Sequence, residues 1–110
     1  MNNMLTERQK KFLERAIELS RIGMQNGSGG PFGCVIIMED AIVGEGYNRV
    51  TSTNDPTAHA EVVAIREACK KLGTYQLNDC EIYTSCEPCP MCLGAIYWAR
   101  PKSVVFPNTR

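Results

Sequence analysis

The amino-acid sequence predicts a single α/β domain of three layers with a mixed central sheet. Helical and strand patterns alternate along the 110 residues in the order α-β-β-α-β-α-β, and neither a repeat nor a linker interrupts them. The length and an apolar content of 44% suit one hydrophobic core. We therefore expect one domain that covers residues 1–110.

The first helix is expected at about residues 7–25, because apolar side chains recur there at three- and four-residue spacing. Thr6 and Gln9 have the spacing of a capping box, which favours a helix start at this point. The segment Gly27–Pro31 should end the helix, since glycine tolerates positive φ and proline cannot continue a helix.

Two strands are expected next, at Phe32–Met38 and Ala41–Tyr47. Only Glu39 and Asp40 separate them, a length that predicts a hairpin although neither is a preferred turn residue. The polar segment Asn48–Asn54 shows no alternation and is expected to be a loop.

The second helix is expected to start with Asp55 as its cap and Pro56 at its first position. Gly73 should end it, because glycine is favoured just after the last helical residue. Its apolar side chains are spaced so that one face packs on the core, and they are Val62, Ile65, Cys69 and Leu72.

The last three elements are expected to be a strand at Cys80–Thr84, a helix at Pro88–Ala99 and a strand at Ser103–Phe106. The prolines of this helix lie only in its first turn, and Pro101 follows its end. A strand, a helix and a strand in succession favour a right-handed parallel unit. The functional site of such a unit is expected beyond the carboxyl ends of its strands.

Charge and hydropathy exclude several classes of protein. Lys plus Arg and Asp plus Glu both total 12, so the net charge is zero and gives no general attraction for nucleic acid. The longest apolar stretch, Leu93–Ala99, is far shorter than the roughly 20 residues of a membrane span. The N-terminus has no apolar signal region. We therefore expect a soluble, cytoplasmic protein that binds neither membranes nor nucleic acid.

The six cysteines are divided between a cluster and scattered positions. Without a secretory signal, such a count indicates metal-binding or catalytic thiols together with buried small residues. Three cysteines lie at three-residue spacing, which favours a metal site, and these are Cys86, Cys89 and Cys92. The scattered cysteines are expected to pack in the core, and these are Cys34, Cys69 and Cys80.

Two short motifs carry the residue types of a zinc site. His59 and Glu61 flank one residue in the first turn of the second predicted helix, and Cys89 and Cys92 open the third. One imidazole and two thiolates leave a tetrahedral zinc ion with an open fourth position, as in catalytic zinc sites. We therefore predict that His59, Cys89 and Cys92 bind zinc.

The predicted positions at helix N-termini should lower the pKa of the thiols, because these ends carry partial positive charge. Zinc lowers the pKa of bound water, but another group must take that proton and return it to a leaving amine. Glu61, two residues beyond a ligand, is expected to be this proton shuttle. The pattern H-x-E…P-C-x-x-C is the known signature of zinc-dependent nucleobase deaminases.

Four residues near these motifs allow two interpretations. Cys86 is expected to be a small residue beside the metal ligands, and the alternative is that it closes a structural site with four ligands. By residue type alone, Asn48 is more simply a turn residue than a contact to a base edge. Phe32 and Trp98 are by the same reasoning core residues, although Phe32 could also stack on a planar substrate.

From Gly30 to about Val105 the chain resembles the cytidine deaminase superfamily, and most closely the bacterial guanine deaminases within it. The resemblance implies a cytidine deaminase-like sandwich and zinc held by the predicted ligands, with Glu61 as proton shuttle. It rests on the segments Gly30–Gly33, Asn54–Val62, Tyr75–Leu77 and Tyr83–Pro101.

The resemblance also implies that Asn48, Phe32 and Ala60 contact a purine base, which reverses the simpler interpretation of Asn48. The implied reaction is the hydrolytic deamination of guanine to xanthine and ammonia, a step of purine metabolism. The tRNA adenosine deaminases share these motifs, but a net charge of zero and the sequence around Pro90 favour the guanine enzymes. A zinc-binding remnant without catalysis is a further alternative.

Guanine deaminases continue beyond the last residue of this sequence into a further helix, a strand and a tail that helps to close the pocket. We therefore expect the domain to lack these elements. Val104–Phe106 should form a strand parallel to Cys80–Thr84 with an uncovered edge, which is a template for association. The expectation is a homodimer in which the partner chain covers this edge or the neighbouring helical face.

Overall fold

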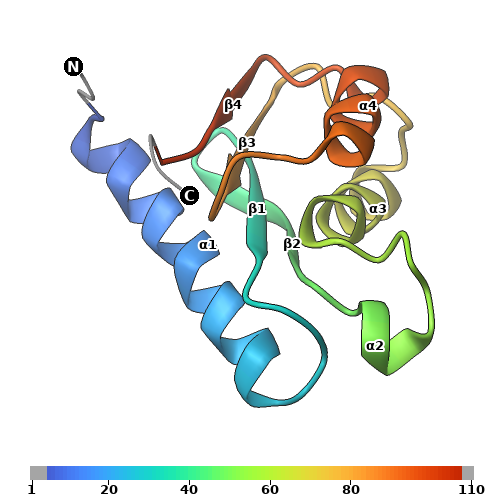
Figure 1. Cartoon of the computed structure of the whole chain (residues 1–110). Coiled ribbons are helices and arrows are strands. Elements are labelled where there is room, and N and C mark those ends of the chain that lie inside the picture. Colours follow the sequence, from blue (N-terminus) through green and yellow to red (C-terminus); the bar gives the residue numbers. More distant parts are fainter. Residues whose placement is uncertain (1–4, 108–110) are drawn as a thin grey trace.

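Four helices and four strands are formed within residues 5–107, which are the residues that the computed structural model describes (Figure 1). No helix in this part of the chain is long and apolar enough to cross a membrane. In chain order the elements are α1 (Glu7–Gln25), β1 (Gly33–Met38), β2 (Ala41–Tyr47), α2 (Val50–Thr53), α3 (Ala60–Leu72), β3 (Cys80–Thr84), α4 (Pro90–Ala99) and β4 (Ser103–Val105).

The strands form one mixed sheet in the order β2-β1-β3-β4. β1 pairs antiparallel with β2 and with β3, whereas β3 pairs in parallel with β4. α1 covers one face of the sheet, and α3 and α4 lie on the opposite face (Figure 1). The predicted three-layer α/β fold, with its hairpin and its parallel pair, is thereby confirmed.

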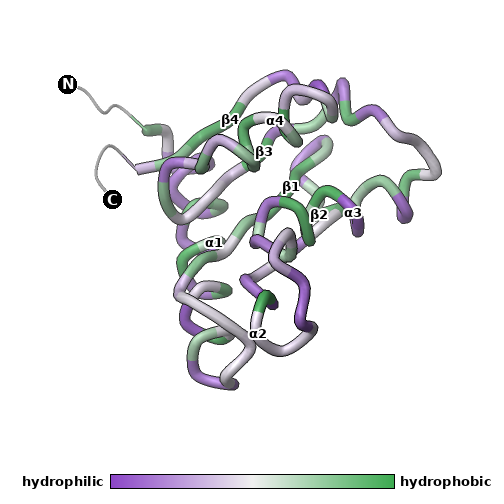
Figure 2. Tube along the Cα trace, turned by 45° about the vertical axis from the view of Figure 1, so that its right-hand side comes forward, coloured by the Kyte–Doolittle hydropathy of each residue, from purple (hydrophilic) through white to green (hydrophobic). Residues whose placement is uncertain are grey.

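The central strand β1 is buried on both faces, which is why both need a helical layer. Cys34 and Ile36 join the core beneath α3 and α4, whereas Val35 and Ile37 join the core beneath α1. All four side chains are 0% exposed. Complete burial of a valine or an isoleucine stabilises the fold by about 1.5–3 kcal/mol. In Figure 2 the central strands are largely hydrophobic, while α1 alternates between hydrophilic and hydrophobic positions.

Two local predictions are confirmed at the level of single hydrogen bonds. The side chain of Thr6 accepts from the backbone N–H of Gln9, whose own side chain accepts from the backbone N–H of Thr6. This is the complete capping box at the start of α1. Glu39 and Asp40 have φ values of 49° and 67°, the left-handed conformation that a two-residue hairpin turn of type I′ requires. The two-residue length of the connection therefore determines the turn conformation more strongly than the turn preferences of Glu39 and Asp40.

The start of α3 differs from the prediction. The helix begins at Ala60, and its N-cap is His59, four residues after the predicted cap Asp55. The carboxylate of Asp55 instead accepts hydrogen bonds from the backbone and hydroxyl of Thr57, which stabilises a turn before the helix. The segment Asn48–Asn54, expected to be a loop, contains the short helix α2.

Proline positions explain the shorter ends of α4 and β4. The residue before a proline is pushed towards extended backbone. Cys89 precedes Pro90 and has ψ 170°, so α4 begins at Pro90 rather than at the predicted Pro88. Phe106 precedes Pro107 and lies outside β4, which still pairs in parallel with β3 as predicted.

The buried face of α3 is lined by three alanines, and the predicted side chains Ile65, Cys69 and Leu72 pack against the same core beside them. Ala60, Ala64 and Ala68 are each 0% exposed. A Cβ atom on Gly46 would lie 2.5 Å from the carbonyl oxygen of Ala60, so α3 lies directly against β2. This close contact fixes the position of the helix that carries the site. The predicted side chains are half-buried at the flank of the helix, and they are Val62, Ile65, Cys69 and Leu72.

Candidate metal centre

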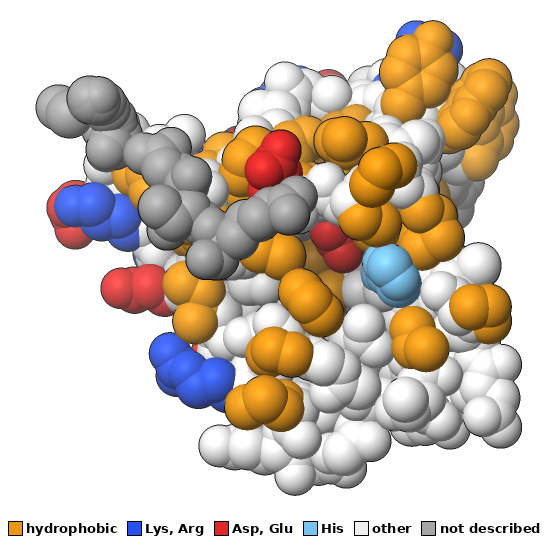
Figure 3. Space-filling model, in the orientation of Figure 1, with side chains coloured by type: hydrophobic (Ala, Val, Ile, Leu, Met, Phe, Trp, Pro, Cys, Tyr) orange, Lys and Arg blue, Asp and Glu red, His pale blue; other side chains and the backbone are white. Residues whose placement is uncertain are grey.

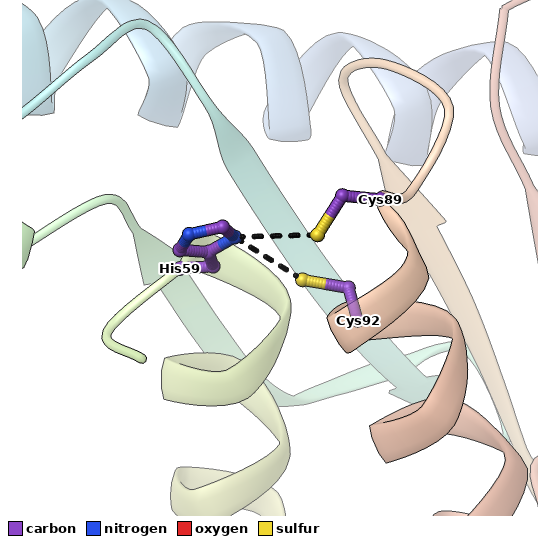
Figure 4. Close-up of side chains that lie close together, drawn as sticks. All are labelled: His59, Cys89 and Cys92. Atoms are coloured by element: carbon purple, nitrogen blue, oxygen red, sulfur yellow. Dashed lines mark hydrogen bonds between the residues drawn. The ribbon is translucent and has the colours of Figure 1, made fainter. Parts of the chain in front are cut away.

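His59, Cys89 and Cys92 come from the N-terminal ends of α3 and α4. His59 is the N-cap of α3, Cys89 is the N-cap of α4, and Cys92 lies in the first turn of α4. Both N-caps have extended backbone, with ψ values of 157° and 170°, which lets their side chains project beyond the ends of the helices. Figure 4 shows the imidazole of His59 pointing towards the two sulfur atoms.

The distances between these three side chains fit one zinc ion. The Nδ1 atom of His59 lies 3.6 Å from the Sγ atom of Cys89 and 3.5 Å from that of Cys92. In a tetrahedral site with ordinary zinc–nitrogen and zinc–sulfur bond lengths, the nitrogen and sulfur atoms are about 3.6 Å apart. A nitrogen and two sulfur atoms also have the ligand character that zinc prefers. The residues present therefore fit the metal predicted from the motif.

Burial changes the expected ionisation of one ligand. Cys92 is 0% exposed, and burial, followed by the nearby carboxylate of Glu61, raises the pKa of its thiol well above the ordinary value. At Cys92 the effect of burial outweighs that of the helix N-terminus, which was predicted to lower the pKa of the thiol. A buried thiolate needs a positive charge beside it, and a zinc ion supplies this charge.

A pocket of about 160 Å³ opens onto the metal ligands. Five of the predicted site residues line it together, although they come from four separate parts of the chain, and these are Phe32, Asn48, His59, Glu61 and Cys89. Figure 3 shows the single histidine of the chain at the surface, next to a recessed acidic side chain and among hydrophobic side chains. Glu61, in the first turn of α3, is only 6% exposed, so its carboxylate faces a largely dehydrated site.

Asn48 and Phe32 have surroundings that agree with the resemblance more than with residue type. Asn48 is 8% exposed and lines the pocket, and its Oδ1 atom accepts from the backbone N–H of Val50 at 3.0 Å. It therefore stabilises a turn and faces the pocket at once. Phe32 is 41% exposed at the pocket before β1 begins, so the prediction that it is a core residue is wrong.

The family to which the chain belongs follows from a comparison over almost its whole length. The family model for the cytidine and deoxycytidylate deaminase zinc-binding region matches residues 6–108. The chain belongs to this family. Its predicted superfamily and its zinc cofactor are thereby confirmed.

Relatives within the deaminase family act on different substrates. Guanine deaminase of Bacillus subtilis (strain 168) is 67% identical over 95 residues, which are 86% of this chain and 61% of that protein. The tRNA-specific adenosine deaminase of Aquifex aeolicus (strain VF5) is 40% identical over 95 residues, or 86% of this chain and 62% of that protein. The chain therefore spans about three fifths of the length of these curated relatives.

A solved structure of the family has nearly the same fold. The X-ray structure of guanine deaminase from Bacillus subtilis matches with a TM-score of 0.89 at 60% identity. The match covers 99% of this chain and 66% of the other chain. The deaminase fold predicted from the resemblance is therefore confirmed.

Two other residues have surroundings that differ from those predicted. Ala60 is 0% exposed, so its side chain does not reach the pocket, and only its backbone at the start of α3 could contact a substrate. Trp98 is 71% exposed and packs edge-to-face on the ring of Tyr97, so the prediction that it packs in the core is wrong. Neither environment is visible in the residue type alone.

The loop before α4 contributes two further residues to the wall of the pocket. Cys86 lines the pocket, but the ligand atoms that gather within 4.8 Å of one another are those of His59, Cys89 and Cys92. This grouping favours three protein ligands over a closed site with four. Glu87 also lines the pocket and was not singled out from the sequence, where its position between Cys86 and Cys89 was the available signal.

Proposed function

We propose that the protein is a zinc-dependent aminohydrolase that converts guanine and water to xanthine and ammonia. The observation that carries this proposal is the pocket in which Glu61, Asn48 and Phe32 lie beside the metal ligands. Its volume of about 160 Å³ is below the range of roughly 300–1,000 Å³ that is common for drug-sized ligands, which suits a single base. The guanine deaminase that is 67% identical to the chain supports the choice of base.

The chain's own residues divide the reaction between proton transfer and substrate positioning. Zinc held by His59, Cys89 and Cys92 would lower the pKa of a water molecule and so supply a nucleophile at neutral pH. Glu61 takes one proton of this water and delivers it to the ring nitrogen, and it then moves the second proton, from the newly added hydroxyl group, to the departing amine. The ring of Phe32 offers a face on which a planar base can stack.

Two rival functions are weaker on the same observations. A tRNA adenosine deaminase would carry basic side chains for the phosphate backbone, whereas this sequence has a net charge of zero. A non-catalytic zinc protein would gain from a fourth protein ligand, whereas three side chains form the metal group. A dehydrated carboxylate beside these ligands also has no evident structural task.

Among the candidate substrates, guanine should give the highest kcat/KM. The panel comprises guanine, adenine, cytosine, cytidine and a tRNA anticodon stem-loop, each tested for ammonia release with the zinc-loaded protein. We expect guanine to exceed adenine by at least about tenfold, because a site that hydrogen-bonds one base leaves polar groups unpaired with another. Turnover of the stem-loop without turnover of guanine would refute the substrate while leaving the reaction class intact. No turnover of any compound would favour the non-catalytic alternative.

We propose in addition that the enzyme is a cytoplasmic homodimer of purine metabolism. Support for the dimer comes from large exposed side chains on α4, where Leu93 is 50%, Tyr97 62% and Trp98 71% exposed. Hydrophobic side chains gather over this helix in Figure 3, and exposed groups of this kind mark interaction sites. Sedimentation at micromolar concentration should give twice the chain mass, and charged substitutions at Leu93 and Trp98 should halve it. A monomeric wild-type protein would contradict the dimer.

A further inference from the structure

Asn48 is a buried amide with only half of its hydrogen-bonding groups engaged by the protein. Its Oδ1 atom accepts from the backbone N–H of Val50 at 3.0 Å. Its Nδ2 group has no hydrogen-bond partner among residues 5–107, although the side chain is only 8% exposed and lines the pocket. Buried polar groups are almost always paired with protein, water or a ligand, so this donor is available to a molecule bound in the pocket. The bond to Val50 fixes the orientation of the amide, and the Nδ2 group is the donor that this orientation leaves for the pocket.

The backbone around Asn48 is held in place by the preceding loop. The backbone N–H of Asn48 donates to the carbonyl oxygen of Phe32 at 3.2 Å. The carbonyl oxygen of Ser28 accepts from the backbone N–H of Ser52 at 3.2 Å and from the hydroxyl of Thr51 at 3.0 Å. Residues 28–32 are therefore fixed against the end of β2 and against α2. The backbone of Asn48 has little freedom to retreat from this loop.

Gly29 occupies the point of closest approach between the loop and Asn48. A Cβ atom at Gly29 would lie 2.7 Å from the carbonyl oxygen and 2.9 Å from the Cγ atom of Asn48, and closer still to Oδ1. Carbon atoms prefer separations of about 3.5–4.0 Å. The positive-φ glycines within residues 5–107 are Gly27 and Gly73. Glycine is therefore required at position 29 because a Cβ atom would collide with Asn48, and not because the backbone there has a positive φ.

We propose that Gly29 is a positioning residue that holds Asn48 in its base-binding orientation, an inference that rests on the proposed function above. A side chain at position 29 rotates the amide of Asn48, breaks its bond to Val50 and turns the Nδ2 donor away from the pocket. Gly29 is not among the residues that line the pocket or form the metal group. Its effect should therefore fall on the affinity for the base and leave zinc binding intact.

A double-mutant cycle tests this coupling. KM and kcat are measured for the wild type, Gly29→Ala, Asn48→Ala and the double variant, with the base that the substrate panel identifies. Each single variant should raise KM by about tenfold, the equivalent of one lost hydrogen bond, with a smaller change in kcat. The double variant should be no worse than Asn48→Ala, because both changes remove the same contact. A rise in KM equal to the product of the single effects would overturn the proposal.

Two further variants keep the result interpretable. Gly94→Ala is the matched control, since its Cβ atom would meet nothing within 4 Å, and it should leave KM unchanged. Asn48→Asp keeps the acceptor for Val50 but replaces the Nδ2 donor with a second acceptor and adds a negative charge, so it should raise KM at least as much as Gly29→Ala does. An unchanged KM would overturn the proposal.

Zinc content and the thermal midpoint are measured for every variant. Zinc content should stay at the wild-type value in Gly29→Ala, whereas the thermal midpoint should fall by a few degrees, because the new Cβ atom also meets the backbone carbonyl oxygen of Asn48. If this variant loses zinc or fails to fold, Gly29 is required for folding and not for the orientation of the Asn48 amide, which also overturns the proposal. An inactive wild type would count against the proposed function, whereas an active wild type with additive effects would count only against the role of Gly29.

Discussion

Replacement of Glu61 by glutamine is expected to lower kcat by about 100- to 10,000-fold while zinc remains bound. Glutamine has nearly the same size as glutamate but cannot carry the proton between water and the leaving amine. The carboxylate of Glu61 is one of the causes that raise the pKa of the Cys92 thiol. Its removal therefore gives no reason for weaker metal binding. Steady-state kinetics together with metal analysis of the purified variant provide the measurement.

Glu67→Gln is the matched control for this experiment. Glu67 lies on the same helix and accepts a hydrogen bond from the backbone N–H of Glu45 at 2.9 Å, a bond that a glutamine can also accept. Its activity should stay close to that of the wild type. A Glu61→Gln enzyme with wild-type kcat would show that another group moves the proton.

Replacement of His59 by alanine is expected to remove both the metal and the activity. The two cysteines alone cannot complete the set of three protein ligands, and the buried thiol of Cys92 loses the cation that compensates its charge. The loss of activity should be at least as large as that of Glu61→Gln. The thermal midpoint should fall too, because zinc binding stabilises the folded state relative to the unfolded chain.

Metal content after dialysis and thermal unfolding with and without a chelator would measure both effects. A chelator should shift the wild type towards the variant and leave the variant unchanged. Cys69→Ala is the control, because Cys69 lies on the flank of α3 outside the metal group and should keep zinc. Stoichiometric zinc in His59→Ala would mean that the proposed ligand set is wrong.

The sequence predicted most reliably those features that depend on local spacing. The capping box of Thr6 and Gln9 and the strands of the sheet follow from neighbours within a few residues. The start of α3 was predicted wrongly because the carboxylate of Asp55 can accept from backbone N–H groups either in a helix cap or in a turn. It accepts from Thr57 in a turn that precedes the helix. Side-chain preference alone does not decide between such partners.

The chemistry of the candidate site was predicted from residue types and their spacing, whereas Phe32 and Asn48 in the pocket wall were predicted only through the resemblance. The spacing of His59, Cys89 and Cys92 restricts the metal ligands strongly, and the structure brings these three side chains together. The exposure of Phe32 and Trp98 depends on which elements lie above them. Exposure is set by the packing of segments that are distant in sequence, and the type of a single residue does not predict it.

The metal ligands join parts of the chain that are 30 and 33 residues apart. A bound ion therefore acts as a cross-link that closes a loop containing all of α3, all of β3 and the start of α4. In the chain-entropy model a covalent link across a loop of this length restricts the unfolded chain by about 3–4 kcal/mol. A substitution that loosens the packing of α3 against α4 therefore weakens the zinc cross-link, even where the substituted residue does not contact a zinc ligand. Variants in the helical layer should consequently be compared at fixed free zinc, because their apparent stability includes the strength of this closure.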